Sequence, residues 1–517
     1  MSIQPIHRIN LAAAISLGTC LLICSELSAL QAASDRPIDL ATASSPPRLT
    51  HVADNTPLAA LVRGLFSVIG GTIQSLDIER AEDASVTVPV FIDGEIKHLV
   101  LEPHSLRDAT FQVLVPGRNG RLQPLHPLPE PKTYRGRIAE QPEAIVAATI
   151  IGDRVTAFIA LPDMTWHYIQ PIADRVPGAD SNQHLVYSGD DAISTPGMCG
   201  NDHAGFQNPL GQDPQPAPGA HGFGDLKEPH ADHGSDGGAA TNTGFAAFTA
   251  VVAFDADFPY FQANNSSVND TINAIETVMN GVNVVYLRDT FVQHQIGTII
   301  VRASAQADPY TTTNHEVLLS QFRTHWIAAH TDVPRHTAHL FTGRSLDGNF
   351  IGFAWIGVVC SNVNNGFGFA LSEVTFSELA ADRVALVAHE LGHNWSAQHC
   401  NQAPNVSNPC HIMCSSIDGC AGYGAPQFGP QAKNAITSFA ANASCLSASL
   451  QVRWVDMNHQ GHLLGTFNFP FNQLGAAAAS APVNGHIIIK SSSGFEAVTI
   501  NKALTIHTWN GTSTVGQ

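Results

Sequence analysis

The chain has 517 residues, of which 44% are hydrophobic and 13% are charged. This composition is too apolar for an intrinsically disordered chain, and the length suffices for two to four domains. The formal net charge is −18 and no run of basic residues occurs, which excludes nucleic acid as an expected partner.

The first residues have the pattern of an export signal. His7 and Arg8 precede an apolar run, LAAAISLGTCLLIC, and small residues follow it. This run is short for a membrane span but typical of a secretory signal, so we expect a signal peptide over residues 1–33 and a secreted, extracellular protein. No later stretch of the sequence predicts a membrane span.

Short strands are predicted from about residue 60 to residue 190. Segments such as SVTVPVFIDG alternate apolar and polar positions, and the apolar run over residues 144–160 is interrupted at Gly152 and Asp153, which predicts a β-hairpin. From residue 200 to about residue 242, Pro, Gly, Asp and His dominate and no apolar periodicity remains. We therefore expect a β-rich domain followed by an exposed linker.

From Phe245 the pattern becomes α/β. AFTAVVAF, IGTIIV, TAHLFTG and IGFAWIGVVC predict strands, and the segments that follow Ser267 and Asn314 predict helices with one apolar face. The next predicted helix carries AHELGHN, and Thr375 and Glu378 form a candidate capping box at its start. Short alternating segments after Cys445 predict a further β-rich module.

The AHELGHN helix carries the residue types of a metal site. His389 and His393 are four residues apart, so both imidazoles project from one face of a helix, a spacing that suits two ligands of one tetrahedral zinc ion. Glu390 lies beside the ligands and is placed to act as a general base. His399 completes a set of three histidines only if the chain turns near Ser396, and three histidines leave a fourth zinc position open.

The cysteines are grouped around this motif. Seven follow the predicted signal peptide, and six of them lie between residues 360 and 445. An even cluster in an exported chain indicates three disulfides, for which 15 pairings exist. Cys199 is left over and needs its own explanation.

Several of these segments resemble one family of zinc peptidases. HELGHNWSAQH resembles the long zinc motif of the metzincins, and CHIM, which ends at Met413, resembles their Met-turn. Within the metzincins, AHLFTG followed by FIGFAWIGVVCS most resembles the substrate strand of the reprolysin or adamalysin-like family, and the similarity covers about Phe245 to Cys445. The preceding segment is similar to that family's propeptide, and PGMCG resembles its cysteine-switch motif.

The resemblance implies an α/β fold with three parts. A metzincin catalytic domain, with a mixed sheet, helices and a zinc cleft, would follow a β-rich propeptide and precede a short β-rich tail. In the tail, GTFNFPFNQLGAAAASAP resembles the opening of right-handed β-helix domains, which suggests a module for binding a surface or another protein. The expected boundaries are a signal peptide at 1–33, a propeptide at 34–199, a linker at 200–243, a metallopeptidase domain at 244–446 and a C-terminal module at 447–517.

The resemblance also implies roles for single residues. The protein would be a secreted endopeptidase that cuts internal bonds of proteins or peptides, made as a latent zymogen that a cut in the linker activates. The implied roles are one zinc per chain on His389, His393 and His399, Glu390 as general base, Met413 as the floor of the site, Ile351 and Gly352 as substrate-binding residues, and Cys199 as the zinc ligand of the zymogen.

The sequence departs from the family at several positions. Ser396 replaces a glycine, which costs roughly 1–2 kcal/mol if the backbone there is left-handed. Thr249 and His336 stand where the acidic residues of the family's calcium site are expected, so we expect no calcium there. Ser415 stands where some metzincins carry a tyrosine ligand, so we expect no fifth protein ligand.

Two alternatives remain open at this stage. The family favours the disulfides Cys360–Cys445, Cys400–Cys420 and Cys410–Cys414. The rival arrangement is a second, structural zinc on Cys400, Cys410, Cys414 and Cys420. The alternative functions are a catalytically weak metzincin-fold protein that binds partners, and an adhesin whose function lies in the tail.

Overall fold

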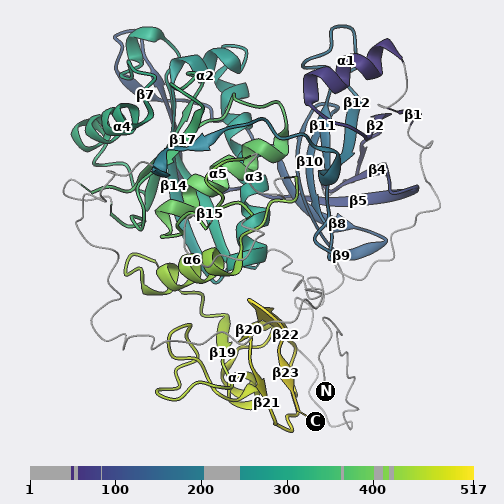
Figure 1. The fold of residues 1–517 in the computed structure, drawn as a ribbon, viewed down its shortest axis with the longest axis vertical. Coiled ribbons are helices and arrows are strands. Elements are labelled where there is room, and N and C mark those ends of the chain that lie inside the picture. Colours follow the sequence, from purple (N-terminus) through teal and green to yellow (C-terminus); the bar gives the residue numbers. More distant parts are fainter. Residues whose placement is uncertain are drawn as a thin grey trace, which may run out of the picture.

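The computed structural model describes residues 48–51, 56–82, 84–202, 245–361, 366–400, 411–417, 424–446 and 448–516. We divide them into an N-terminal region (48–202), a central region (245–446) and a C-terminal module (448–516), which Figure 1 shows packed together. Among the described helices, none has the length and apolar character needed to cross a bilayer.

The N-terminal region is built on a ten-stranded antiparallel sheet. Alternating side chains of this sheet are buried, and the predicted hairpin is present, with Ile151 paired to Arg154. The strands, in their order across the sheet, are β1 (Arg48–His51), β2 (Thr72–Ser75), β12 (Gln183–Ser188), β11 (Trp166–Pro171), β10 (Arg154–Ala160), β9 (Gln141–Ile151), β8 (Thr133–Ile138), β5 (Glu95–Pro103), β4 (Val86–Ile92) and β3 (Glu79–Arg80).

A mixed eight-stranded sheet forms the centre of the molecule. Its middle strands are almost completely buried, as their continuous apolar sequences predict. The strands, in order, are β13 (Met198–Cys199), β17 (Phe350–Ala354), β18 (Phe369–Glu373), β16 (Thr337–Thr342), β14 (Phe248–Ala256), β15 (Val292–Val301), β6 (Arg107–Pro116) and β7 (Leu122–Pro124).

The N-terminal region supplies strands at both edges of this central sheet. The β6–β7 hairpin pairs in parallel with β15 at one edge, and β13 pairs in parallel with β17 at the other. The sequence did not indicate this pairing, because a strand's apolar pattern shows that one face is buried but not which strand it pairs with. The two regions therefore share one sheet and one continuous apolar core.

Seven helices surround the sheets in the described residues. The long helix α3 begins after the N-cap Ser267, whose hydroxyl accepts a hydrogen bond from the Asp270 N–H. It packs against β15 and α5 on one side and against β8, β9 and β10 on the other, which explains why nearly all its residues are buried. The helices are α1 (Pro57–Phe66), α2 (Phe258–Ala263), α3 (Val268–Thr290), α4 (His315–Ala329), α5 (Ala380–Asn394), α6 (Pro430–Asn442) and α7 (Leu474–Ser480).

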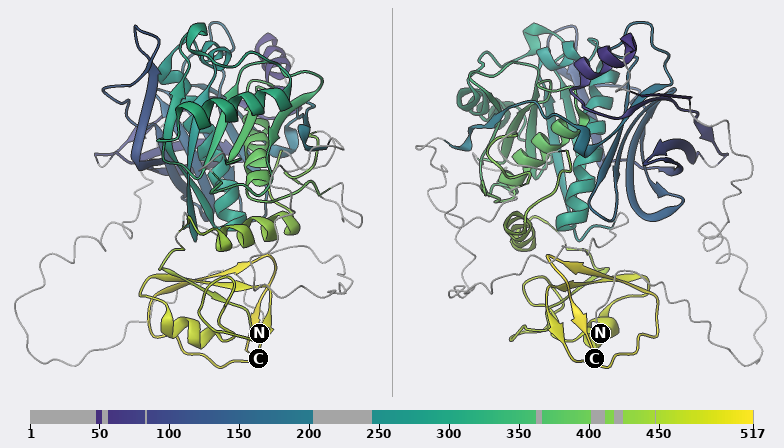
Figure 2. Two further views of the ribbon diagram at one scale, coloured as in Figure 1. Left: turned by 90° about the vertical axis from the view of Figure 1, so that its left-hand side faces the viewer. Right: turned by 45° about the vertical axis from the view of Figure 1, so that its right-hand side comes forward.

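The C-terminal module contains three parallel strands, β19 (Val452–Val455), β20 (Gly485–Lys490) and β22 (Leu504–Trp509), and a short parallel pair, β21 (Ser493–Gly494) and β23 (Thr514–Val515). Figure 2 shows it below α6. The ring of Phe245 stacks on His486 of β20 with centroids 3.8 Å apart, so this module contacts the start of the central region.

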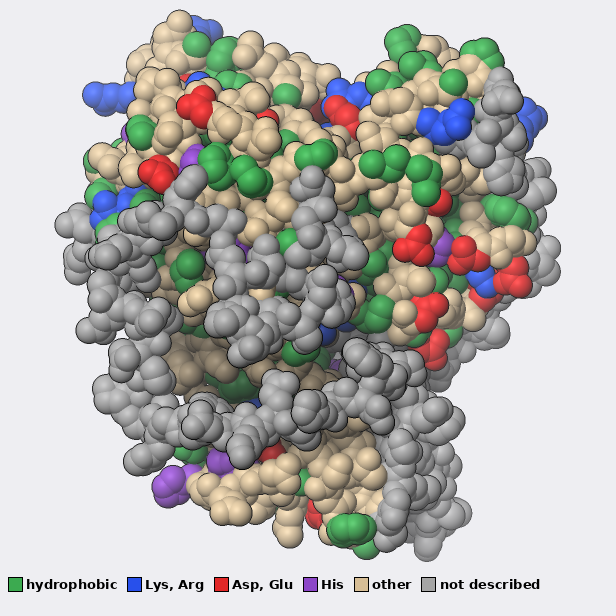
Figure 3. Space-filling model, viewed as in Figure 1, with side chains coloured by type: hydrophobic (Ala, Val, Ile, Leu, Met, Phe, Trp, Pro, Cys, Tyr) green, Lys and Arg blue, Asp and Glu red, His purple; other side chains and the backbone are tan. Residues whose placement is uncertain are grey.

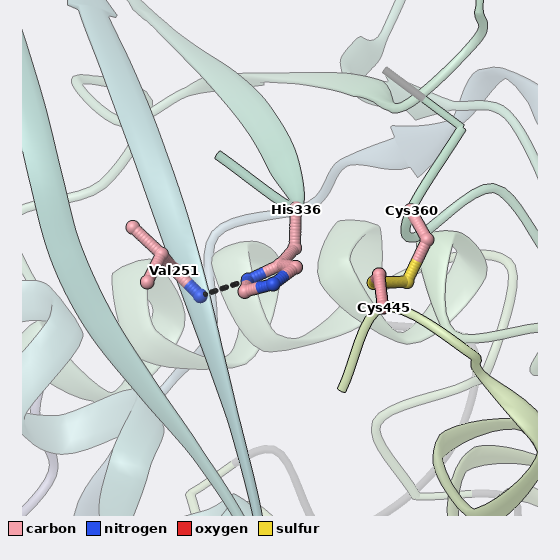
Figure 4. Close-up of a disulfide and its surroundings, with 4 residues drawn as sticks. All are labelled: Val251, His336, Cys360 and Cys445. Atoms are coloured by element: carbon pink, nitrogen blue, oxygen red, sulfur yellow. Dashed lines mark hydrogen bonds between the residues drawn. A yellow bond between two sulfur atoms is a disulfide. The ribbon is translucent and has the colours of Figure 1, made fainter. Parts of the chain in front are cut away.

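A disulfide joins Cys360 to Cys445 and closes the central region (Figure 4). Beside it, Nδ1 of His336 accepts a hydrogen bond of 2.7 Å from the Val251 N–H. Cys400 and Cys414 are also disulfide-bonded, so their sulfurs are not available as thiolate ligands of a second zinc. The other cysteines of the predicted pairs, Cys410 and Cys420, lie outside the described residues.

Candidate metal centre

The helix that carries the histidine motif, α5, begins in a way that the sequence did not predict. The predicted capping box is wrong, because the N-cap residue is Leu379 and its side chain makes no capping bond. Instead, Ser377 Oγ accepts the Leu379 N–H at 3.1 Å, and Gln170 Oε1 of the N-terminal region accepts the Ala380 N–H at 3.0 Å. The N-terminal region thus accepts a hydrogen bond from one of the backbone N–H groups that have no partner within the helix.

At its other end, α5 stops in a Schellman arrangement. Ser396 has a φ of 78°, the left-handed conformation considered above, and its N–H donates to the His393 carbonyl. The Ala397 N–H donates to the Gly392 carbonyl at 2.9 Å. This reversal brings His399 back toward α5.

The three histidines meet at one point. The Nε2 atom of His393 lies 3.0 Å from Nε2 of His389 and 3.1 Å from Nε2 of His399. All three side chains are buried, and burial lowers the pKa of His393 well below its usual 6.5, with the neighbouring histidines acting in the same direction. A neutral imidazole is the form that can ligate a metal.

Two hydrogen bonds define the tautomers of this cluster. His389 Nδ1 lies 2.6 Å from the Ile412 carbonyl, and His393 Nδ1 lies 2.8 Å from the Ala397 carbonyl. A carbonyl only accepts, so each Nδ1 carries the proton and each Nε2 presents a lone pair. Two such lone pairs 3.0 Å apart repel one another unless a cation lies between them, so the residues fit a metal ion.

Cys199 completes a set of four donor atoms. Its Sγ lies 3.5 Å from His393 Nε2, and the ligand atoms of Cys199 and the three histidines all lie within 4.8 Å of one another. A tetrahedral zinc site, with bonds of roughly 2.0–2.1 Å to nitrogen and 2.3 Å to sulfur, places nitrogens about 3.3 Å apart and sulfur about 3.6 Å from nitrogen. The three distances between Nε2 atoms, 3.0–3.1 Å, and the distance of 3.5 Å from Cys199 Sγ to His393 Nε2 match these values to within a few tenths of an ångström.

Glu390 faces the same point from α5. It is 0% exposed, its Oε1 has no hydrogen-bond partner among the described residues, and its Oε2 lies 3.8 Å from Cys199 Sγ. Burial raises the pKa of Glu390 well above its usual 4.5, although the contact with Cys199 acts in the opposite direction. Gly352 leaves room for this carboxyl group, since a Cβ there would lie 2.1 Å from Oε1.

The segment that carries Cys199 lies between β17 and residues 415–417. On one side β13 pairs with β17, with Cys199 opposite Gly352. On the other side the Cys199 N–H donates to the Ser415 carbonyl at 2.9 Å, and the Ile417 N–H donates to the Gly197 carbonyl at 2.9 Å. Ile351, the other residue expected to bind substrate, lines the same narrow pocket as Cys199 and Glu390.

Two glycines allow this close fit. A Cβ on Gly197 would lie 2.4 Å from Cδ1 of Ile351, and a Cβ on Gly200 would lie 2.4 Å from Cδ2 of His315. The sequence analysis did not identify His315 or the backbone of residues 415–417 as parts of the site. The only signal in the sequence was the glycine on each side of Met198-Cys199 in PGMCG.

Met413 packs against the helix that carries His389 and His393. Its side chain is 0% exposed, and a Cβ on Gly392 would lie 2.7 Å from its sulfur. The Cys400 N–H donates to the Met413 carbonyl at 3.0 Å, which fixes the residue that follows His399. Met413 thus packs against α5 at Gly392, which lies between His389 and His393 in the sequence.

Comparisons with known proteins match the region that contains His389, His393 and His399. Residues 248–445 match the reprolysin model described as Metallo-peptidase family M12. Mouse (Mus musculus) disintegrin and metalloproteinase domain-containing protein 19 is 26% identical over 253 residues, which are 47% of this chain and 25% of that protein. This chain therefore matches only about a quarter of the length of that relative.

Two solved structures show weaker similarity. Metalloproteinase-II from Bacteroides fragilis matches with a TM-score of 0.33 and 12% identity, over 69% of this chain and 88% of that one. A chaperone-substrate complex matches with a TM-score of 0.28 and 15% identity, over 38% of this chain and 34% of that one. Neither TM-score is high enough to support an argument. The family match and the HELGHNWSAQH motif identify residues 248–445 as a reprolysin-like metzincin domain of metallopeptidase family M12, a class of metalloendopeptidases.

Proposed function

We propose that this protein is the exported zymogen of a zinc endopeptidase, with the N-terminal region as its propeptide. The observation that carries the proposal is the buried group of four donor atoms on Cys199, His389, His393 and His399, with Glu390 beside it. Three histidines and one cysteine suit zinc, and a site whose fourth ligand can leave suits catalysis.

His389, His393 and His399 would hold the metal in the active enzyme. A bound zinc ion supplies a Lewis acid, which polarises the peptide carbonyl and lowers the pKa of a water molecule. The Glu390 carboxylate would take a proton from the attacking water and give it to the nitrogen of the leaving amine.

Cys199 would keep the precursor inactive in two ways. Its sulfur would fill the fourth zinc position and lie against the carboxyl group that acts as the base. Its backbone lies between β17 and residues 415–417. An extended substrate peptide would pair with the same backbone groups, so substrate and β13 exclude one another.

The surface is consistent with protein or peptide substrates rather than nucleic acid. On the face in Figure 3, acidic side chains gather over β5, β8 and β9, and basic side chains are scattered. The chain as a whole has a net charge of −18. We propose that the C-terminal module binds a surface or another protein, since its residues lie outside the family match.

Proteolysis of an unstructured protein tests the proposal. The central region, separated from the propeptide by denaturation and refolded with zinc, should digest casein. A zinc chelator should abolish the digestion, and added zinc should restore it. Digestion that continues in excess chelator, or no digestion by a folded zinc-loaded sample, would argue against a zinc endopeptidase.

A further inference from the structure

We infer that the N-terminal region remains bound to the central region after the linker has been cut, so that activation requires a separate dissociation step. This inference rests on the proposed function and concerns how that same site is regulated. A cut within residues 203–244 leaves Cys199 on the N-terminal fragment. Whether the site opens then depends on the non-covalent contacts between the two fragments.

The first contact is a shared sheet. β6 pairs in parallel with β15, with Val113 opposite Ile299 and Leu114 opposite Ile300. These positions on β15 are 0% exposed. Loss of the β6–β7 hairpin would leave the backbone groups of β15 without partners along one edge and expose apolar side chains to water.

The second contact is a set of buried polar groups on α3. Glu276 is 1% exposed and Asn280 is 0% exposed. Arg107 of β6 donates to both oxygens of Glu276, from Nε at 2.6 Å and from Nη2 at 3.3 Å. Arg135 of β8 donates to Asn280 Oδ1 at 2.9 Å, and Asn280 Nδ2 donates to the Ala148 carbonyl of β9 at 2.9 Å.

These groups on α3 belong to the central region, while all the partners just described belong to the N-terminal region. A buried carboxylate is costly when its cationic partner is removed, because the remaining charge is not compensated. The capping bond from Gln170 to α5 and the bond from Tyr168 Oη to the Gly424 carbonyl at 2.8 Å add to the same interface. The central region therefore binds its own propeptide as a partner.

A two-fragment experiment tests this inference. The recognition site of a sequence-specific protease is placed within residues 203–244, the purified full chain is cut, and the product is passed through a size-exclusion column at physiological salt. We expect the two fragments to elute together, and peptide cleavage to stay within about twofold of the uncut precursor. Fragments that separate on the column after the cut would overturn the inference.

Variants of the Arg107–Glu276 ion pair test whether this interface holds the fragments together. Arg107→Ala leaves Glu276 buried without its cation, and should speed the dissociation of the cut fragments at least tenfold. Arg118→Ala, in the exposed turn between β6 and β7, is the matched control and should leave the rate unchanged. If the Arg107→Ala precursor does not fold, Arg107→Lys provides a milder change, and equal dissociation rates for Arg107→Lys and the wild type would count against the inference.

The outcomes separate this inference from the proposed function. Fragments that elute together, but whose separated central fragment is folded and zinc-loaded and still cleaves no peptide, would contradict the proposed function and leave the interface as described. Fragments that part at once and become active would support the zymogen and contradict the inference.

Discussion

Cys199 lies directly opposite Gly352 in the parallel pairing of β13 and β17. Because Gly352 has no side chain, the carboxyl group of Glu390 can lie against β17, where its Oε2 is 3.8 Å from the sulfur of Cys199. One pair of residues thus brings together the substrate strand, the proposed base and the proposed latency ligand.

Replacement of Glu390 by glutamine should separate metal binding from catalysis. Glu390→Gln removes the proton acceptor and leaves the three imidazoles in place, so the activated enzyme should keep about one zinc per chain and lose about 10²–10⁴-fold in kcat. Zinc content and kcat are measured on the same sample, with Glu316→Gln, at an exposed glutamate of the central region, as control. A variant with near wild-type turnover would exclude Glu390 as the base.

Replacement of Cys199 by serine should weaken latency. A serine hydroxyl is a poor zinc ligand beside a thiolate, so the uncut Cys199→Ser precursor should cleave a peptide at least about tenfold faster than the uncut wild type. It should remain slower than the separated central region, because the backbone of β13 still covers β17. Met198→Ala, at a neighbouring position that is 37% exposed, is the control and should stay silent. A Cys199→Ser precursor that cleaves no peptide would mean that latency is caused by the backbone of β13 covering β17, without a contribution from the sulfur.

Ser396→Gly should stabilise the protein. Ser396 has a φ of 78°, where a residue with a Cβ is strained and glycine is not. The free energy of unfolding, from urea titration, should rise by about 1 kcal/mol, and zinc content should not change. A lower stability for the glycine variant would show that the serine hydroxyl contributes more than the strain costs.

A buried histidine predicts a loss of stability in acid. His184 Nε2 accepts the Val155 N–H at 2.8 Å, and its Nδ1 lies 2.7 Å from the Asn182 carbonyl, so its ring is held neutral. Burial lowers the pKa of His184 from 6.5 to about 4. The unfolded chain therefore binds more protons than the folded one below pH 6.5, and stability is lost as the pH falls from 6.5 toward 4.

The size of this loss can be measured by unfolding at two pH values. The shift of His184 should cost about 2 kcal/mol of the free energy of unfolding between pH 7 and pH 5. His184→Gln should show a smaller loss over this interval, while the exposed His462→Gln should behave as the wild type. Equal losses in all three proteins would show that His184 does not titrate in this range.

Local features of the fold could be predicted from the sequence. The spacing of His389 and His393 predicted that their imidazoles share one face, and their Nε2 atoms lie 3.0 Å apart. The interrupted apolar run predicted the β9–β10 hairpin, and Ser267 marks the start of α3. Each of these features depends on residues close together in the chain, where periodicity and capping preferences act.

Features that depend on distant residues could not be predicted. Nothing in the local pattern of β6 shows that it pairs with β15, and nothing near Ala380 shows that Gln170 accepts its N–H. Strand partners and tertiary caps are chosen by the packing of the whole chain. For the same reason the sequence did not show that strands of the N-terminal region form both edges of the central sheet.

X-ray absorption at the zinc edge of the purified, uncut precursor tests the central claim most directly. The account predicts one zinc per chain with three nitrogen neighbours at about 2.0–2.1 Å and one sulfur at about 2.3 Å, and predicts that the sulfur signal disappears in Cys199→Ser. A precursor whose zinc has no sulfur neighbour, or has three or four, would contradict it.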